Sequence, residues 1–133
     1  MTNVSASFQL GDLKISQLSD GATFRDPRIL FDGVEESEWV EALGLSNSSE
    51  SIPFNFSTFL VESQKNKWLV DTAYGFREPE ENTESCAELL IRLSEKGVQP
   101  QDIDFVVHSH LHFDHVGWNL DENDQITFPN AMH

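Results

Sequence analysis

The histidines of this chain are concentrated in one short segment. Of the five histidines among its 133 residues, four fall between positions 108 and 115. They follow directly on residues 103–107, an apolar run interrupted only by Asp104. Such a run is typical of a short strand that is covered on both faces of a sheet. The fold must therefore place a polar, histidine-rich turn at the end of a buried strand.

Patterns with a period of two predict several further strands. Alternating apolar residues over 8–18 predict a β-hairpin whose turn is Gly11-Asp12. Residues 20–34 contain Asp-Pro and Asp-Gly pairs and are typical of a loop. Other strands are expected at 56–62, 68–72 and 125–128.

Two segments have the spacing of amphipathic helices. In residues 83–96, an apolar stripe repeats at i, i+3, i+4 and i+7 from Cys86. Gly97 suits the left-handed residue that ends such a helix, and a shorter helix is expected at 35–43. Strands followed by a strand–helix–strand unit argue for an α/β layered fold, with residues 1–133 as a single domain.

Charge and cysteine content restrict the partners and the compartment. The chain has 8 Lys and Arg against 23 Asp and Glu, a net charge of −15. Such a chain repels phosphate backbones and anionic lipid surfaces, so we expect neither nucleic acid nor membrane as a partner. The single cysteine, Cys86, excludes an intrachain disulfide and suits a cytoplasmic location, where thiols stay reduced.

The segment after the predicted strand at 103–107 carries the donor atoms of a metal site. His110 and His112 are two positions apart, so on an extended backbone they point the same way. Asp114 and His115 follow where a turn can bring them back beside the strand. Imidazoles and carboxylates are ligands that Zn²⁺ and similar cations select. The spacing favours two adjacent cations with open positions, where a bound water with a pKa of about 7 becomes a nucleophile.

These residues lead to a family resemblance. Residues 110–115 are His-Leu-His-Phe-Asp-His, and this run resembles the H-x-H-x-D-H signature of the metallo-β-lactamase-fold hydrolases. Residues 68–72 and 97–104 resemble the same superfamily in matching order, and the sequence around the motif is most similar to its lactonase-like and organophosphate-hydrolase-like branches. The resemblance implies the N-terminal half of an αβ/βα sandwich, with a mixed sheet flanked by helices. Residues 1–133 would then be one domain, truncated at its C-terminus relative to the family.

The same resemblance implies a role for each residue of the motif. His110 and His112 would bind one metal ion, and Asp114 and His115 would bind a second. Asp114 would also act in catalysis by orienting the attacking water. Asp71, at the end of a predicted strand, would hold a ligand histidine by a hydrogen bond. A helix cap or turn cap is the alternative role for Asp71.

His108 precedes the motif by two residues. In the family this position is usually not a ligand, so the expectation is a packed histidine or one that supports a ligand from behind. The alternative is a shifted register in which His108, His110 and His112 form a three-histidine site. That register leaves Asp114 and His115 without a role.

The activity implied by the resemblance is hydrolysis with two zinc ions. The bond would be an ester, lactone, amide or phosphoester in a small molecule. The ligand set does not separate zinc from iron or manganese, because metal availability decides between them in the cell. The alternative is a catalytically incomplete fragment, since the family draws its remaining ligands from a second half. Such a fragment would bind metal weakly, or associate with a partner chain or another copy through the uncovered face of its sheet.

Overall fold

The computed structural model describes residues 6–78 and 83–133. Within these ranges six strands form one sheet in the order β1-β2-β3-β4-β6, and β5 pairs with β2 beside this path. The strands are β1 Ser7–Leu10, β2 Leu13–Arg25, β3 Ile52–Glu62, β4 Lys67–Val70, β5 Thr83–Ser85 and β6 Phe105–Val107. The helices are α1 Pro27–Leu30, α2 Glu36–Leu43 and α3 Leu89–Glu95, with short 3₁₀ turns η1 Pro100–Asp102 and η2 Gly117–Asn119.

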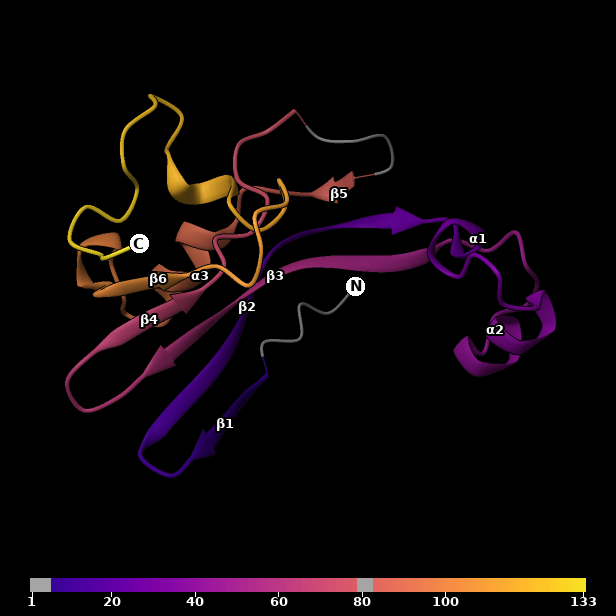
Figure 1. The fold of residues 1–133 in the computed structure, drawn as a ribbon, viewed down its shortest axis with the longest axis horizontal. Coiled ribbons are helices and arrows are strands. Elements are labelled where there is room, and N and C mark those ends of the chain that lie inside the picture. The colour runs from indigo at the N-terminus through magenta and orange to yellow at the C-terminus, as the bar shows by residue number, and fades with distance from the viewer. Residues whose placement is uncertain (1–5, 79–82) are drawn as a thin grey trace.

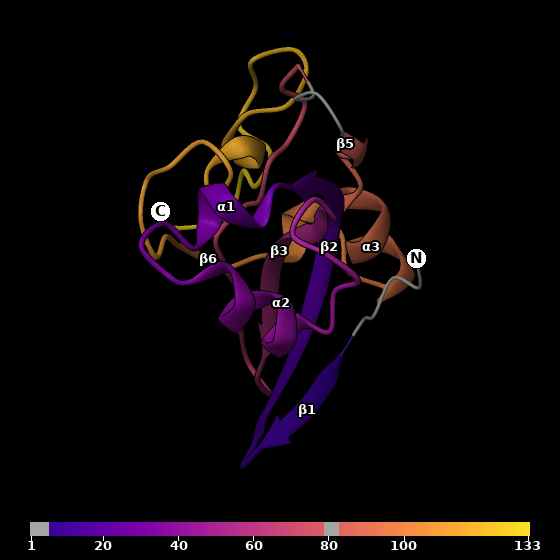
Figure 2. The ribbon, with the colours of Figure 1, turned by 90° about the vertical axis from the view of Figure 1, so that its right-hand side faces the viewer.

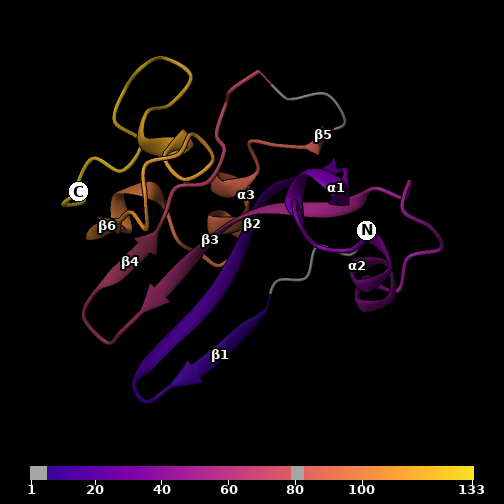
Figure 3. The same cartoon turned by 45° about the vertical axis from the view of Figure 1, so that its right-hand side comes forward.

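The two ends of the sheet carry different elements. β2 and β3 form a long antiparallel ribbon, with α1 and α2 at one end and β4 and β6 beside the other (Figures 1 and 3). Figure 2 shows α3 beside β2, and its residues Leu89 and Leu93 are fully buried. Across the described ranges, no helix has both the length and the apolar character that crossing a bilayer requires.

Strand pairing explains how distant segments come together. The hairpin predicted over 8–18 is confirmed, because β1 and β2 pair antiparallel around a turn at Gly11, whose φ is 59°. β4 and β6 run parallel instead, with Val70 opposite Val107. Parallel neighbours need a crossover connection, and here that connection contains α3. The chain therefore leaves β4 and β6 at the same edge of the sheet.

One face of the sheet is covered and the other is open. The covered face packs against α3 and the segment after β6, and the buried core consists of Leu18, Leu60, Leu69, Leu89, Leu93, Val98, Ile103, Val106, Trp118 and Phe128. On the opposite face Phe59 and Trp68 are each 42% exposed, and Val107 is 48% exposed. The prediction that the strand at 103–107 is covered on both faces is therefore wrong.

The helix predicted over 83–96 begins late, at Leu89. Ala87 has a φ of 60°, in the left-handed region that a right-handed helix does not contain. The residues before it form β5, paired with β2. Cys86 therefore precedes the helix and is half-buried, not part of its apolar stripe. The predicted end is confirmed, since Gly97 follows with a φ of 73°.

The predictions for three other segments have mixed outcomes. The helix predicted over 35–43 is confirmed as α2, which ends at the left-handed Gly44. The predicted loop at 20–34 is wrong in its first part, because β2 continues to Arg25 and α1 follows. The strand predicted at 125–128 does not form among the described residues. An isolated bridge between residues 120 and 126 stands in its place, because the loop turns on the side chain of Asp121.

Candidate functional site

Two loops meet at the edge where β4 and β6 end. The first starts at Asp71, directly after β4, and the second starts at His108, directly after β6. The Asp71 N–H donates to the carbonyl of Val107 at 2.8 Å, and the Thr72 N–H donates to the carbonyl of His115, also at 2.8 Å. The motif therefore lies on a loop beyond the strand, not on the extended backbone that the sequence suggested for it.

Further along, the same loops contact each other through their backbones. The Gly117 N–H donates to the Ala73 carbonyl at 2.7 Å, and the Trp118 N–H donates to the Thr72 carbonyl at 3.0 Å. There is no room for a side chain between them: a Cβ at Gly117 would lie 1.9 Å from the carbonyl oxygen of Tyr74. The glycine is required because the two backbones approach this closely.

Asp71 is the main polar link between the loops. Its Oδ1 accepts the N–H of Ser109 at 2.7 Å, and its Oδ2 accepts the Ser109 hydroxyl at 2.7 Å. Oδ2 also lies 2.8 Å from Nδ1 of His115. Burial alone would raise the pKa of Asp71, but the hydrogen bonds with His115 and Ser109 outweigh burial and lower that pKa below its usual value. Two residues of this loop have a positive φ: Asp71 at 65° and Ala73 at 50°. Non-glycine residues adopt this conformation mainly where the surrounding structure enforces it.

The histidines of the motif gather beside this carboxylate. A turn closes when the His115 N–H donates to the His112 carbonyl at 3.0 Å, as the sequence predicted for the residues after the strand. The ring of His110 lies 3.9 Å from the ring of His115 and 4.6 Å from that of His112, measured between centroids. Asp114 approaches from the other side of His115, with its Oδ2 3.7 Å from Nε2.

His108 occupies a different position from the other histidines. Its Nδ1 lies 3.2 Å from the carbonyl oxygen of His115 and 3.9 Å from Oδ1 of Asp71. Its Nε2 is buried without a hydrogen-bond partner among the described residues. His108 thus contacts the backbone of His115, whereas the ring of His110 lies against the rings of His112 and His115.

Comparison with known proteins identifies the family of this chain. Residues 53–133, more than half of the chain, match the Metallo-beta-lactamase superfamily. This chain belongs to the metallo-beta-lactamase superfamily. The matched region includes both loops of the site, from Asp71 to Trp118.

Solved structures of the metallo-beta-lactamase fold are similar over nearly the whole chain. AidC, a dizinc quorum-quenching lactonase solved with a product, shares 26% identity over 96% of this chain, with a TM-score of 0.79. AbOPH, a hydrolase of the beta-lactamase superfamily, gives the same identity, coverage of this chain and TM-score. A probable metal-dependent hydrolase from Staphylococcus aureus has 24% identity over 95% of the chain and a TM-score of 0.83, a likeness of fold. This chain spans 42%, 43% and 47% of AidC, AbOPH and the S. aureus protein, respectively.

The donors of this metallo-beta-lactamase chain suit a divalent metal by their chemistry. When Nδ1 of His115 donates its proton to Asp71, Nε2 carries the lone pair that a metal needs. The Asp114 carboxylate lies on the side of that Nε2. Among the residues that the structure describes, however, no three His, Cys, Asp or Glu side chains are placed to hold one ion together. The imidazole rings instead lie against one another.

Ser109 is a residue of the candidate site that was not predicted from the sequence. Besides its two hydrogen bonds to Asp71, its hydroxyl lies 3.1 Å from Nδ1 of His110. It therefore contacts the carboxylate and a motif histidine at once. A serine between two histidines carries no distinctive signal, because its role depends on the parallel pairing of β4 with β6, which brings Asp71 within hydrogen-bond distance.

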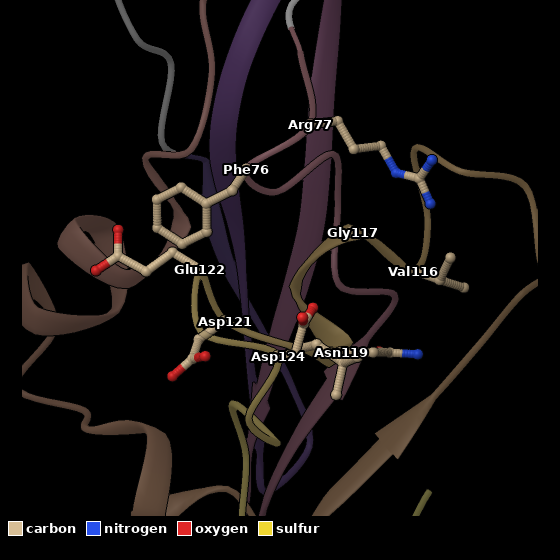
Figure 4. A pocket seen from close by; sticks show the side chains of 9 residues that line it. Phe76, Arg77, Val116, Gly117, Asn119, Asp121, Glu122 and Asp124 are labelled. Atoms are coloured by element: carbon tan, nitrogen blue, oxygen red, sulfur yellow. The ribbon is translucent and has the colours of Figure 1, made fainter.

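An open pocket of about 650 Å³ adjoins the motif in this metallo-beta-lactamase chain (Figure 4). Val116 and Gly117, which directly follow His115, form part of its wall. The remaining lining residues are Phe76, Arg77, Asn119, Leu120, Asp121, Glu122 and Asp124. The pocket thus combines apolar side chains with charges of both signs at the border of the site.

Proposed function

We propose that this chain carries the first metal-ligand motif of a metal-dependent hydrolase. His110, His112, Asp114 and His115 would be the ligands. The observation that carries the proposal is the contact of Asp71 with Nδ1 of His115, which leaves Nε2 free beside Asp114. A carboxylate behind a histidine is the usual support of a metal-ligating imidazole, because it fixes both tautomer and ring orientation.

The chemistry assigned to each residue follows from that arrangement. Divalent ions bound here would polarise the scissile group and supply a nucleophile at neutral pH. Asp114, the proposed catalytic residue, would accept a hydrogen bond from the attacking water and orient it. Asp71 would keep His115 in one tautomer, and Ser109 would hold Asp71 in place. His108 would support the site by fixing the backbone at His115.

The substrate class proposed is a small molecule with an ester, lactone, amide or phosphoester bond. Support comes from AidC, whose structure contains a product, N-hexanoyl-L-homoserine, and from other solved lactonases. Zinc is the metal proposed first, since AidC is described as a dizinc enzyme, with iron and manganese as alternatives for the same ligands. The pocket beside Val116 offers both apolar and charged contacts to such a molecule.

Hydrolysis of an N-acyl homoserine lactone and of an aryl ester tests this proposal. The chain would be assayed with added Zn²⁺, with a chelator, and as His112→Ala. We expect turnover that both the chelator and the substitution reduce at least about a hundredfold, because the ligand set acts as a unit. Turnover that neither treatment changes would show that the hydrolysis does not use this motif.

A second candidate function is that of a chain that needs another copy to complete its fold. One observation favours it, the apolar open face with Phe59, Trp68 and Val107. An apolar sheet face is normally covered by a second layer. Self-association through this face would supply that layer, and an assay of activity against protein concentration would reveal it.

A further inference from the structure

The long strand β2 contains an irregularity at Asp20. Its register with β3 runs from Ser19 opposite Ser57 to Gly21 opposite Phe56, so Asp20 is an extra residue without a partner on β3. This is a β-bulge, a device that bends a strand and re-aims a side chain. Asp20 continues the alternation of β2, in which Ser16 and Leu18 are also buried, so its carboxylate lies on the covered side of the sheet and the residue is fully buried.

Four N–H groups from three separate segments donate to this one carboxylate. Oδ1 accepts the indole N–H of Trp118 at 2.6 Å and the backbone N–H of Leu89 at 2.8 Å. Oδ2 accepts the backbone N–H groups of Tyr74 at 3.0 Å and Gly75 at 2.8 Å. All four acceptor sites of a carboxylate are therefore used. Removal of the carboxylate would leave buried donors unsatisfied, which costs more than the loss of an ordinary hydrogen bond.

The partners of Asp20 belong to both loops of the candidate site. Tyr74 and Gly75 lie on the loop that begins at Asp71, and Trp118 lies three residues after His115. The fourth partner, Leu89, is the first residue of α3, which lies in the crossover that makes β4 and β6 parallel. One side chain thus connects the two loops that carry the site with the helix behind them.

We infer that Asp20 is a positioning residue for the metal ligands, acting through the two loops that it joins. Without the carboxylate, Tyr74 and Trp118 would lose their common anchor. The loops would then separate more readily, and the contact between Asp71 and His115 would be maintained for less of the time. The inference rests on the proposed function for its consequence, a loss of Zn²⁺ affinity, but the positioning itself can be measured without metal.

The test compares Asp20→Asn and Trp118→Phe with a control that destabilises the core elsewhere, Ile103→Ala. Asp20→Asn keeps the shape but replaces one acceptor oxygen by a donor, and Trp118→Phe removes a single donor while keeping an aromatic ring. Hydrogen exchange of the Thr72, Gly117 and Trp118 amides, which join the loops, reports their separation. Zn²⁺ affinity is measured by competition with a chromophoric chelator at a temperature where every variant is folded.

We expect exchange at the three amides to rise at least about tenfold more in Asp20→Asn and Trp118→Phe than in Ile103→Ala, after correction for melting temperature. Zn²⁺ affinity should fall about tenfold or more in the same two variants and stay near the parent value in the control. Exchange and affinity that follow melting temperature alone in all three variants would overturn the inference. If Asp20→Asn does not fold, the hydrogen exchange and Zn²⁺ affinity of Trp118→Phe decide whether the inference holds. If the unaltered chain binds no Zn²⁺, the proposed function fails, and the exchange data still decide the role of Asp20.

Discussion

The carboxylate of Asp71 lies 2.8 Å from Nδ1 of His115, a contact between residues 44 positions apart in the chain. The contact exists because β4 and β6 are parallel neighbours, so the residues that follow them lie at one edge of the sheet. It gives the imidazole a defined tautomer and the carboxylate a defined partner.

Asp71→Asn should destabilise the chain in a pH-dependent way. The pKa of Asp71 in the folded state is lowered below 3.8. Its stabilising contribution is therefore fully present above that value and is lost as the pH falls through the lowered pKa. We expect a loss of about 2 kcal/mol in the free energy of unfolding near neutral pH. Urea titrations of both proteins, repeated from about pH 7 down to about pH 3, should show this difference shrinking below the usual aspartate pKa.

The control for this series is Asp12→Asn, in the exposed turn between β1 and β2. Its difference from the parent should stay small at every pH, since surface substitutions usually change stability by less than about 0.5 kcal/mol. A difference for Asp71→Asn that is equally large at all pH values would mean that ionisation of Asp71 does not contribute to stability.

Gly75→Ala and Gly97→Ala separate close packing from backbone conformation. Both glycines have a φ of 73°, so each alanine carries the same left-handed strain, about 1–2 kcal/mol. At Gly97 a Cβ would meet nothing within 4 Å, but at Gly75 it would lie 2.4 Å from the carbonyl oxygen of Gly117. Overpacking should cost Gly75→Ala a further 1–3 kcal/mol or so. If thermal unfolding gave the same loss of stability for both variants, the loops would be able to move apart at no cost in free energy.

Ser109→Ala should weaken metal binding more than it weakens the fold. The hydroxyl donates to Asp71 and contacts His110, so its loss loosens the carboxylate that supports His115. Removing such a supporting partner typically lowers metal affinity by about 10–100-fold. Isothermal titration with Zn²⁺ measures this, with Ser94→Ala on the exposed side of α3 as the control. An affinity equal to that of the control would assign Ser109 no part in the site.

Trp68→Glu should reduce self-association if the open sheet face is an interface. Trp68 is 42% exposed on that face, next to Phe105, and a buried carboxylate there would have no partner. We expect the dimer dissociation constant from sedimentation to rise at least about tenfold. Ile29→Glu is the matched control, because Ile29 is 75% exposed on α1, at the other end of the sheet. A chain that is monomeric before substitution would contradict the proposal directly.

The sequence predicts the parts of the fold that local patterns determine. The hairpin at Gly11 and the helix that ends at Gly44 depend on near neighbours, and both are confirmed. The strand predicted at 68–72 forms as β4 but ends at Val70, so Asp71 directly follows the strand and does not lie within it. The late start of α3 could not be predicted, because a left-handed alanine at position 87 depends on the pairing of β5 with β2.

The candidate site, too, is predicted from the sequence only where local patterns determine it. The run of donor residues at 110–115 is visible in the sequence, but the ring contacts of His110 and the support from Ser109 depend on tertiary structure. Asp20 belongs to none of the sequence motifs described above. Its role becomes visible only in the structure, where four N–H groups from three segments converge on its carboxylate.

The metal content of the purified chain shows whether residues 110–115 bind metal. Elemental analysis after dialysis against Zn²⁺ would compare the chain with a His110→Ala/His112→Ala double variant. We expect about one to two zinc ions per chain in the parent and a clear loss in the double variant. The same content in both proteins, whether high or near zero, would contradict the assignment of these histidines as ligands in this chain.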